Sequence, residues 1–158
     1  MNLLFTLRGI PQLYYGTELW MKNFKDPNDG MVRLDFPGGF PNDEKDKRMA
    51  SGRDQTENTA FNYVKTLANF RKTNTALQTG KMMQWLPSDG LYVYFRYDKG
   101  STVMIVLNTS NKTKSVLLSN YGERTNEFKG FKDVVTGVIG ANQIDLAPME
   151  SRVVLLTK

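Results

Sequence analysis

The sequence predicts an α+β chain in two parts. Residues 1–79 are expected to hold short helical pieces, one buried strand and a long loop, and residues 80–158 an antiparallel β-sandwich. Two observations support this division. Apolar residues recur at helical spacing between Asp54 and Lys72, and from Gly80 onward the period changes to two. Short alternating segments separated by turn residues are typical of antiparallel sandwiches.

The composition excludes several kinds of site. The 158 residues include no Cys and no His, which removes disulfides, thiolate and imidazole metal ligands, and His-based catalytic constellations. The formal charge of +5 is spread along the chain, +2 in residues 1–79 and +3 in residues 80–158. Nucleic-acid binders usually concentrate basic charge on one face, so we expect a solvated surface here. We expect no metal, no cofactor, no nucleic-acid partner and no membrane span.

The first element is the apolar stretch 1–7, which closes at Arg8 and Gly9. A basic residue followed by Gly is a helix-end signal. Because the apolar side of this stretch needs a partner, we expect the chain to be the C-terminal part of something larger.

A short apolar and aromatic run follows over residues 10–15, and Gly16 then lets the backbone turn. This is the pattern of a strand buried on both faces. Pro11 cannot donate to a ladder and is expected among the strand's first residues. Ligand sites in parallel α/β folds lie at the carboxyl ends of strands, which here places Tyr15 and Glu18 near a site.

A polar loop over residues 19–53 separates this strand from the helix. Loops this long are usually functional or disordered, and the Pro, Gly and aromatic content favours a folded one. The charge run 43–48 is interpreted as a solvated face. Asp54 and Glu57 then resemble a capping box at the start of the helix, with Asp in place of Ser or Thr.

The second part contains seven predicted strands. Asp89-Gly90 and Asp98-Lys99-Gly100 are expected to be turns between them, and the possible glycosylation sites at Asn108 and Asn111 are interpreted as turn composition. The predicted strands are residues 82–86, 91–97, 102–107, 114–118, 131–135, 143–146 and 151–156.

Several stretches resemble one family. Gly-Ile-Pro-Gln-Leu-Tyr-Tyr-Gly-Thr-Glu at residues 9–18 closely resembles the eighth barrel strand of the α-amylase family of glycoside hydrolases, family 13. Residues 91–97 with 103–108, and Asp-Val-Val-Thr-Gly at 133–137, resemble its C-terminal sandwich. The loop 32–40 is similar to the neopullulanase and cyclomaltodextrinase branch, especially periplasmic starch-utilisation neopullulanases.

This resemblance implies a parent enzyme that hydrolyses α-glucans such as starch, pullulan or cyclodextrin by a retaining mechanism. Residues 1–79 would be the remnant of a (β/α)₈ barrel: the end of helix 7, strand 8, the long loop and helix 8. Residues 80–158 would be the C-terminal sandwich. The family's catalytic carboxylates lie on earlier barrel strands, so no catalytic residue is assigned here and the isolated chain is expected to be inactive. The resemblance suggests a periplasmic location.

Six residues are expected to line the substrate cleft of the parent. Trp20 and Phe36 offer flat apolar faces to a glucose ring, whereas the polar residues can hydrogen-bond hydroxyls or hold the loop. The alternative is that the loop only packs against neighbouring loops. The six candidates are Tyr15, Glu18, Trp20, Arg33, Asp35 and Phe36.

A different class of function is a carbohydrate-binding sandwich without catalysis. Trp85, Tyr92, Tyr94 and Tyr121 could stack on sugar rings, although aromatic residues in alternating strands are more often core or cross-strand pairs. Nucleic-acid binding through basic charge is a weaker third possibility. We also expect residues 80–158 to be the stable unit, and the chain to self-associate through its uncovered barrel face.

Overall fold

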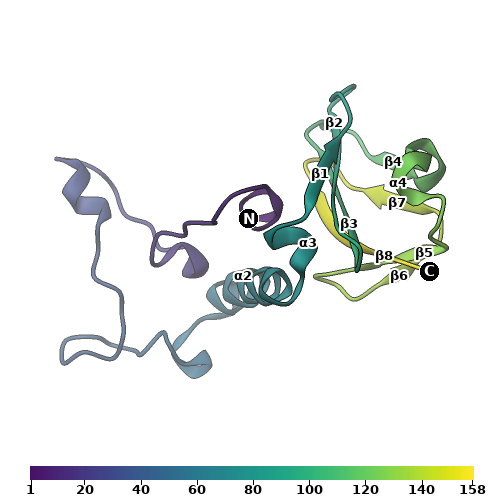
Figure 1. Ribbon diagram of the computed structural model, residues 1–158. Coiled ribbons are helices and arrows are strands. Elements are labelled where there is room, and N and C mark those ends of the chain that lie inside the picture. The colour runs from purple at the N-terminus through teal and green to yellow at the C-terminus, as the bar shows by residue number, and fades with distance from the viewer. The chain divides into compact units, whose positions relative to one another are not determined.

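The computed structural model, drawn in Figure 1, describes all 158 residues. The chain divides into two compact units. One unit combines Met1–Pro11 with Thr66–Lys158, and the other is Gln12–Lys65. Residues 1–11 and 66–79 therefore belong to the same unit as the strands. The boundary between the two units differs from residue 80, where the hydrophobic period of the sequence changes. No helix of the protein is both long enough and apolar enough to cross a bilayer.

The first unit is built on two antiparallel sheets, which confirms the predicted sandwich. The larger sheet has the strand order β1-β2-β3-β8-β5-β6, and β4 pairs with β7 in the smaller one. The strands are β1 Lys81–Gln84, β2 Leu91–Tyr97, β3 Thr102–Asn108, β4 Lys114–Leu117, β5 Gly130–Asp133, β6 Ile139–Gly140, β7 Gln143–Leu146 and β8 Ser151–Thr157.

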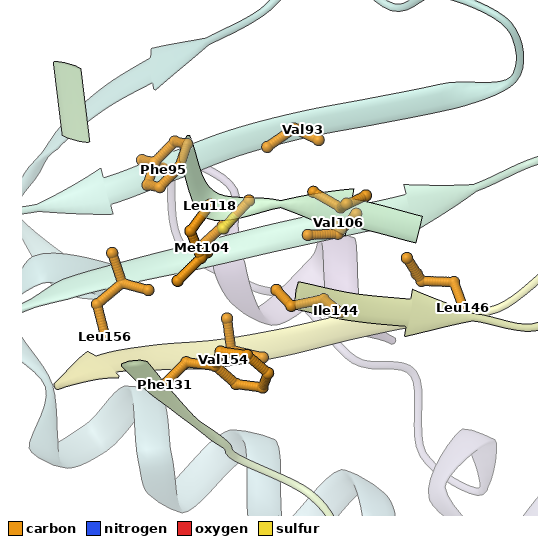
Figure 2. Close-up of a cluster of buried hydrophobic side chains, with 11 residues drawn as sticks. Val93, Phe95, Met104, Val106, Leu118, Phe131, Ile144, Leu146, Val154 and Leu156 are labelled. Atoms are coloured by element: carbon orange, nitrogen blue, oxygen red, sulfur yellow. The ribbon is translucent and has the colours of Figure 1, made fainter. Parts of the chain in front are cut away.

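Alternation of side chains fills the space between the two sheets. Val93 and Phe95 of β2, Met104 of β3, Ile144 of β7 and Val154 of β8 belong to one buried apolar cluster, drawn in Figure 2. Successive residues of a strand point to opposite faces, so every second residue of β2, β3 and β8 enters this core. Asp89 and Gly90 form the turn between β1 and β2. Both adopt positive φ, as a two-residue hairpin turn of type I′ requires.

The opposite face of the large sheet is also covered. Tyr94, Ile105 and Val153 point away from the cluster and are fully or almost fully buried. Two short helices pack there: α1 (Asn2–Thr6) against β8, and α3 (Thr75–Gln78) against β2 and β3. Figure 1 shows α3 on one side of the large sheet and β4, β7 and α4 (Gly122–Thr125) on the other. Both faces of the central strands are therefore buried, which explains why the first unit includes residues outside 80–158.

The predicted helix is α2 (Gln55–Thr73). Its capping box is present: the Glu57 amide donates to Asp54 Oδ1 at 2.8 Å, and the Asp54 amide donates to Glu57 Oε2 at 2.9 Å. Ala60, Val64 and Leu67 form the buried stripe expected from the sequence.

The prediction of a strand over residues 10–15 is wrong. These residues have no regular secondary structure, and Ile10 is 96% exposed. A strand requires neighbours to pair its N–H and C=O groups, and no strand of this chain lies alongside. The loop that follows holds three 3₁₀ turns, at Thr17–Leu19, Asp29–Val32 and Ala50–Gly52, and one isolated β-bridge between Gly38 and Asp46.

Candidate functional site

The candidate site lies in the second unit and begins with a tight turn. Gly16 adopts φ 82°, and its carbonyl accepts hydrogen bonds from the amides of Leu19 at 3.1 Å and Met21 at 3.0 Å. The turn needs glycine because of this positive φ, which residues with a Cβ rarely adopt. Leu19 is buried, whereas Trp20 is 61% exposed. The turn thereby holds the Trp20 indole out toward solvent.

Two tyrosines precede this turn. The Tyr14 and Tyr15 rings stack with their centroids 4.5 Å apart, and the Tyr15 hydroxyl donates to the Leu34 carbonyl at 2.9 Å. The hydrogen bond with Tyr14 raises the pKa of Tyr15. A tyrosine phenol is protonated at neutral pH with or without this shift, so it can act as the donor to Leu34. Tyr15 thus links the segment before the turn to the loop segment that carries Asp35.

Trp20 and Asp35 meet at an open depression of about 570 Å³. It combines an indole, apolar side chains, two ammonium groups and two carboxylates. Binding sites of this kind pair an aromatic surface with a few polar groups that fix orientation. The depression is lined by Trp20, Met21, Lys22, Leu34, Asp35, Pro37, Lys47 and Glu57.

Glu57 has a structural role at one side of this depression. One carboxylate oxygen forms an ion pair with the Lys47 ammonium, and the other accepts the Asp54 amide of the capping box. Both contacts hold the Glu57 carboxylate in place at the start of α2. Sequence reasoning identified Glu57 only as a capping residue and missed Lys22, Lys47 and Met21, because nothing local to a loop shows which side chains will converge.

Polar contacts hold the rest of the loop in shape. The Arg53 guanidinium lies 3.9 Å from the centroid of the Phe61 ring and donates to the Lys47 carbonyl at 3.0 Å. Asp46 receives two hydrogen bonds of 2.9 Å from the Arg48 guanidinium, and these bonds lower the pKa of Asp46. These contacts support a folded loop. The charge run 43–48 is exposed or half-buried, as expected for a solvated face, and Asp46 and Arg48 form an ion pair within it.

The six predicted residues are only partly brought together. Trp20 and Asp35 line the depression, and Tyr15 is tied to it through Leu34. Glu18 is half-buried within the 3₁₀ turn and does not line the depression, and Arg33 is exposed at the end of the turn Asp29–Val32. Phe36 is half-buried rather than presented to solvent.

The aromatic residues of the sandwich pack against other side chains of the same unit. Tyr94 is fully buried, and the Trp85 ring makes edge contacts with Phe95 at 5.2 Å and Tyr121 at 5.1 Å. Asn108 is the buried last residue of β3; its amide donates to two backbone carbonyls, and its side-chain oxygen accepts the Ser110 amide in the turn that follows. These contacts favour the core interpretation of the aromatic residues over a sugar-binding platform.

Comparison with known proteins identifies the family. Residues 82–155 match the cyclo-malto-dextrinase C-terminal domain. A cyclomaltodextrin glucanotransferase of Klebsiella oxytoca is 28% identical over 96% of this chain, and an α-amylase of Niallia circulans is 31% identical over 90%. The chain belongs to the α-amylase family. It covers 20% and 23% of the lengths of these two relatives.

Solved structures of the α-amylase family share the fold. An Anoxybacillus α-amylase superposes on 99% of this chain with a TM-score of 0.73 and 22% identity, and the superposed part is 31% of that chain. At 22% identity, this similarity shows only that the two folds are alike. The family assignment made from residues 9–18 and from the sandwich motifs is confirmed.

Proposed function

We propose that this chain is the C-terminal part of an enzyme that acts on α-glucans such as starch, pullulan or cyclodextrin, cleaving α-glycosidic bonds with retention of configuration. The main support is the similarity to a cyclomaltodextrin glucanotransferase over 96% of the chain, together with the match to a C-terminal domain of the same family. Residues 1–79 would then belong to a (β/α)₈ barrel, as the motif at residues 9–18 suggests. The loop 32–40 supports the neopullulanase branch.

The catalytic carboxylates would come from residues of the parent outside this chain. Retaining glycosidases need two carboxyl groups about 5 Å apart, one of them with a raised pKa to act as an acid. Asp35 and Glu57 are the carboxylates of the depression, and both oxygens of Glu57 already have partners, one in the Lys47 ammonium and the other in the Asp54 amide. Glu57 is therefore occupied by structural contacts, and we infer that the isolated chain does not hydrolyse α-glucans.

The depression around Trp20 would contribute to substrate binding in the parent. The exposed indole offers a flat face to a glucose ring, while Lys22 and Asp35 can hydrogen-bond sugar hydroxyls. Tyr15 would hold the Leu34 backbone and so fix the position of Asp35. In the isolated chain, the exposed apolar side chains Ile10, Phe24 and Phe40 support the expected self-association.

The test is kinetic and uses the complete enzyme. Trp20→Ala should lower kcat/KM for long α-glucans several-fold, because a lost stacking contact costs on the order of 1 kcal/mol when it extends into the transition state. The loss should be smaller for a short aryl glucoside that does not reach this subsite. Phe24→Ala is the matched control, since Phe24 is an aromatic residue of the same loop, 85% exposed and outside the depression.

Two results would contradict this proposal. Equal losses on long and short substrates, together with a lower melting temperature, would make Trp20 a structural residue. An equal effect of Phe24→Ala would show that any exposed aromatic residue of this loop produces the change.

A further inference from the structure

Two arginines of the first unit are buried without an acidic partner. Arg71 lies in the last turn of α2 and is 8% exposed, and Arg96 is the penultimate residue of β2 and is 1% exposed. Neither forms a salt bridge. Burying a charged side chain costs free energy unless strong hydrogen-bond acceptors surround it. The two guanidinium groups must therefore find such acceptors among neutral groups.

Both guanidinium groups bind the backbone at the end of helix α1. Arg71 donates to the carbonyls of Phe5 at 3.0 Å, Leu7 at 3.4 Å and Gly9 at 2.6 Å. Arg96 donates to the Thr6 carbonyl at 2.8 Å. The segment that receives these bonds is therefore residues 5–9.

Arg96 also connects this segment to the sheet. Its second terminal nitrogen donates to the Gly80 carbonyl at 3.2 Å, directly before β1. Tyr94, the neighbour of Arg96 on the same face of β2, hydrogen-bonds the Thr6 hydroxyl at 2.5 Å. From the adjacent part of the sheet, the Ser151 carbonyl and hydroxyl of β8 accept the Asn2 side-chain amide at 3.1 and 2.9 Å.

The physical reason for this pairing is the charge distribution of a helix end. The last carbonyls of a helix lack intrahelical donors and carry partial negative charge. Arginine suits them because its planar fork reaches several acceptors at once. Burial lowers the pKa of both arginines, and Arg71 lowers that of Arg96 further, but arginine remains protonated in proteins. Loss of either side chain would leave backbone carbonyls buried without donors.

The same segment leads into the candidate site. After Gly9, the chain continues through Ile10 and Pro11 to the stacked tyrosines and the turn that presents Trp20. We propose that Arg71 and Arg96 are positioning residues of the enzyme: they fix the backbone of residues 5–9 to the sandwich, and thereby the start of the segment that binds substrate. This inference rests on the proposed function. It assigns the sandwich a contribution to catalysis through these two side chains.

The experiment compares Arg71→Lys, Arg96→Lys and Arg96→Met in the complete enzyme. A lysine keeps the charge but offers its donors from a single nitrogen and lacks the planar fork that reaches separate carbonyls. The lysine variants should therefore fold and weaken the contact, and Arg96→Met should abolish it. Amide hydrogen exchange of residues 5–9 should accelerate by about tenfold or more in each variant. The kcat for a long α-glucan should fall about tenfold, assayed well below the lowest melting temperature of the set, because small displacements of binding groups reduce rates strongly.

Two further variants complete the set. Arg152→Met removes an arginine of the same sheet whose partners are Glu150 and Asp133, and it should leave both exchange at residues 5–9 and kcat unchanged. Asn2→Ala removes the other anchor of α1 and should act in the same direction as the arginine variants.

Each result has a distinct meaning. Faster exchange at residues 5–9 with unchanged kcat would overturn the positioning role and leave a purely structural contact. Unchanged exchange in Arg96→Met would overturn the anchoring itself. A wild-type enzyme with no activity on α-glucans would refute the proposed function, whereas the exchange data would still test the anchoring.

Discussion

Alkaline pH should destabilise this protein through the buried phenol of Tyr94. The ring lies on the helix-covered face of β2 and is fully buried, and its hydroxyl has Thr6 as its partner. Burial raises the pKa of Tyr94 to about 12 from the ordinary value of 10.0, because the phenolate would lose its hydration. In the unfolded chain the same phenol ionises near pH 10.

The direction of the effect follows from proton binding. Between pH 10 and pH 12 the unfolded chain has lost the Tyr94 proton while the folded protein retains it, so unfolding releases a proton and becomes easier as pH rises. The stabilisation is complete below pH 10 and is lost as pH rises toward 12. Two pKa units correspond to about 2 to 3 kcal/mol of unfolding free energy.

The assay is urea denaturation of the wild type and Tyr94→Phe as a function of pH. Below pH 10 the wild type should be more stable by about 1 kcal/mol, the contribution of the hydroxyl's hydrogen bond. Above pH 10 the wild type should lose stability faster than Tyr94→Phe, and the order of the two proteins should reverse before pH 12. In Thr6→Val the tyrosinate absorbance of Tyr94 should appear at still higher pH, because the hydrogen bond with Thr6 lowers its pKa.

Parallel stability curves for the wild type and Tyr94→Phe would refute this reasoning. They would mean that the phenol ionises at the same pH in the folded and unfolded states, and hence that water reaches it under α1. Such a result would also weaken the proposed anchoring of residues 5–9, since the same segment covers Tyr94.

Two further predictions concern the capping box and catalysis. Asp54→Ala should cost about 1 kcal/mol by removing the cap of α2, seen as a lower melting temperature, whereas Gln55→Ala at the next, exposed position should stay within about 0.5 kcal/mol. The isolated 158-residue chain, incubated with starch, pullulan and cyclodextrins, should release no reducing ends above a blank, and turnover that survives repurification would show that it contains a catalytic pair of its own.

Local signals predicted the sandwich strands well. The run 91–97 alternates in the sequence and forms β2 with the same bounds, and the segment 143–146 is β7. Alternation is preserved because every strand has a neighbour within this chain. The run 10–15 shows an equally clear buried-strand pattern but forms no strand, because strand formation depends on a pairing partner that sequence pattern alone does not supply.

The candidate site was predictable only where one loop residue could be judged by itself. The exposure of Trp20 follows from a local turn, and the capping role of Glu57 follows from its spacing to Asp54. The convergence of Lys47 and Asp35 with Trp20 brings together residues up to 27 positions apart and depends on how the whole loop folds.

By itself, the sequence determined the secondary structure of the sandwich, the start of α2 and the family, because each depends on the local spacing of residues. Its composition determined the absence of any Cys or His chemistry. The tertiary structure alone decided the roles of Arg71 and Arg96. In the sequence Arg71 is a cation at a helix end and Arg96 a polar residue of an alternating strand. Only folding places both against the carbonyls of a third segment, because the field of a helix end acts through space and not along the chain.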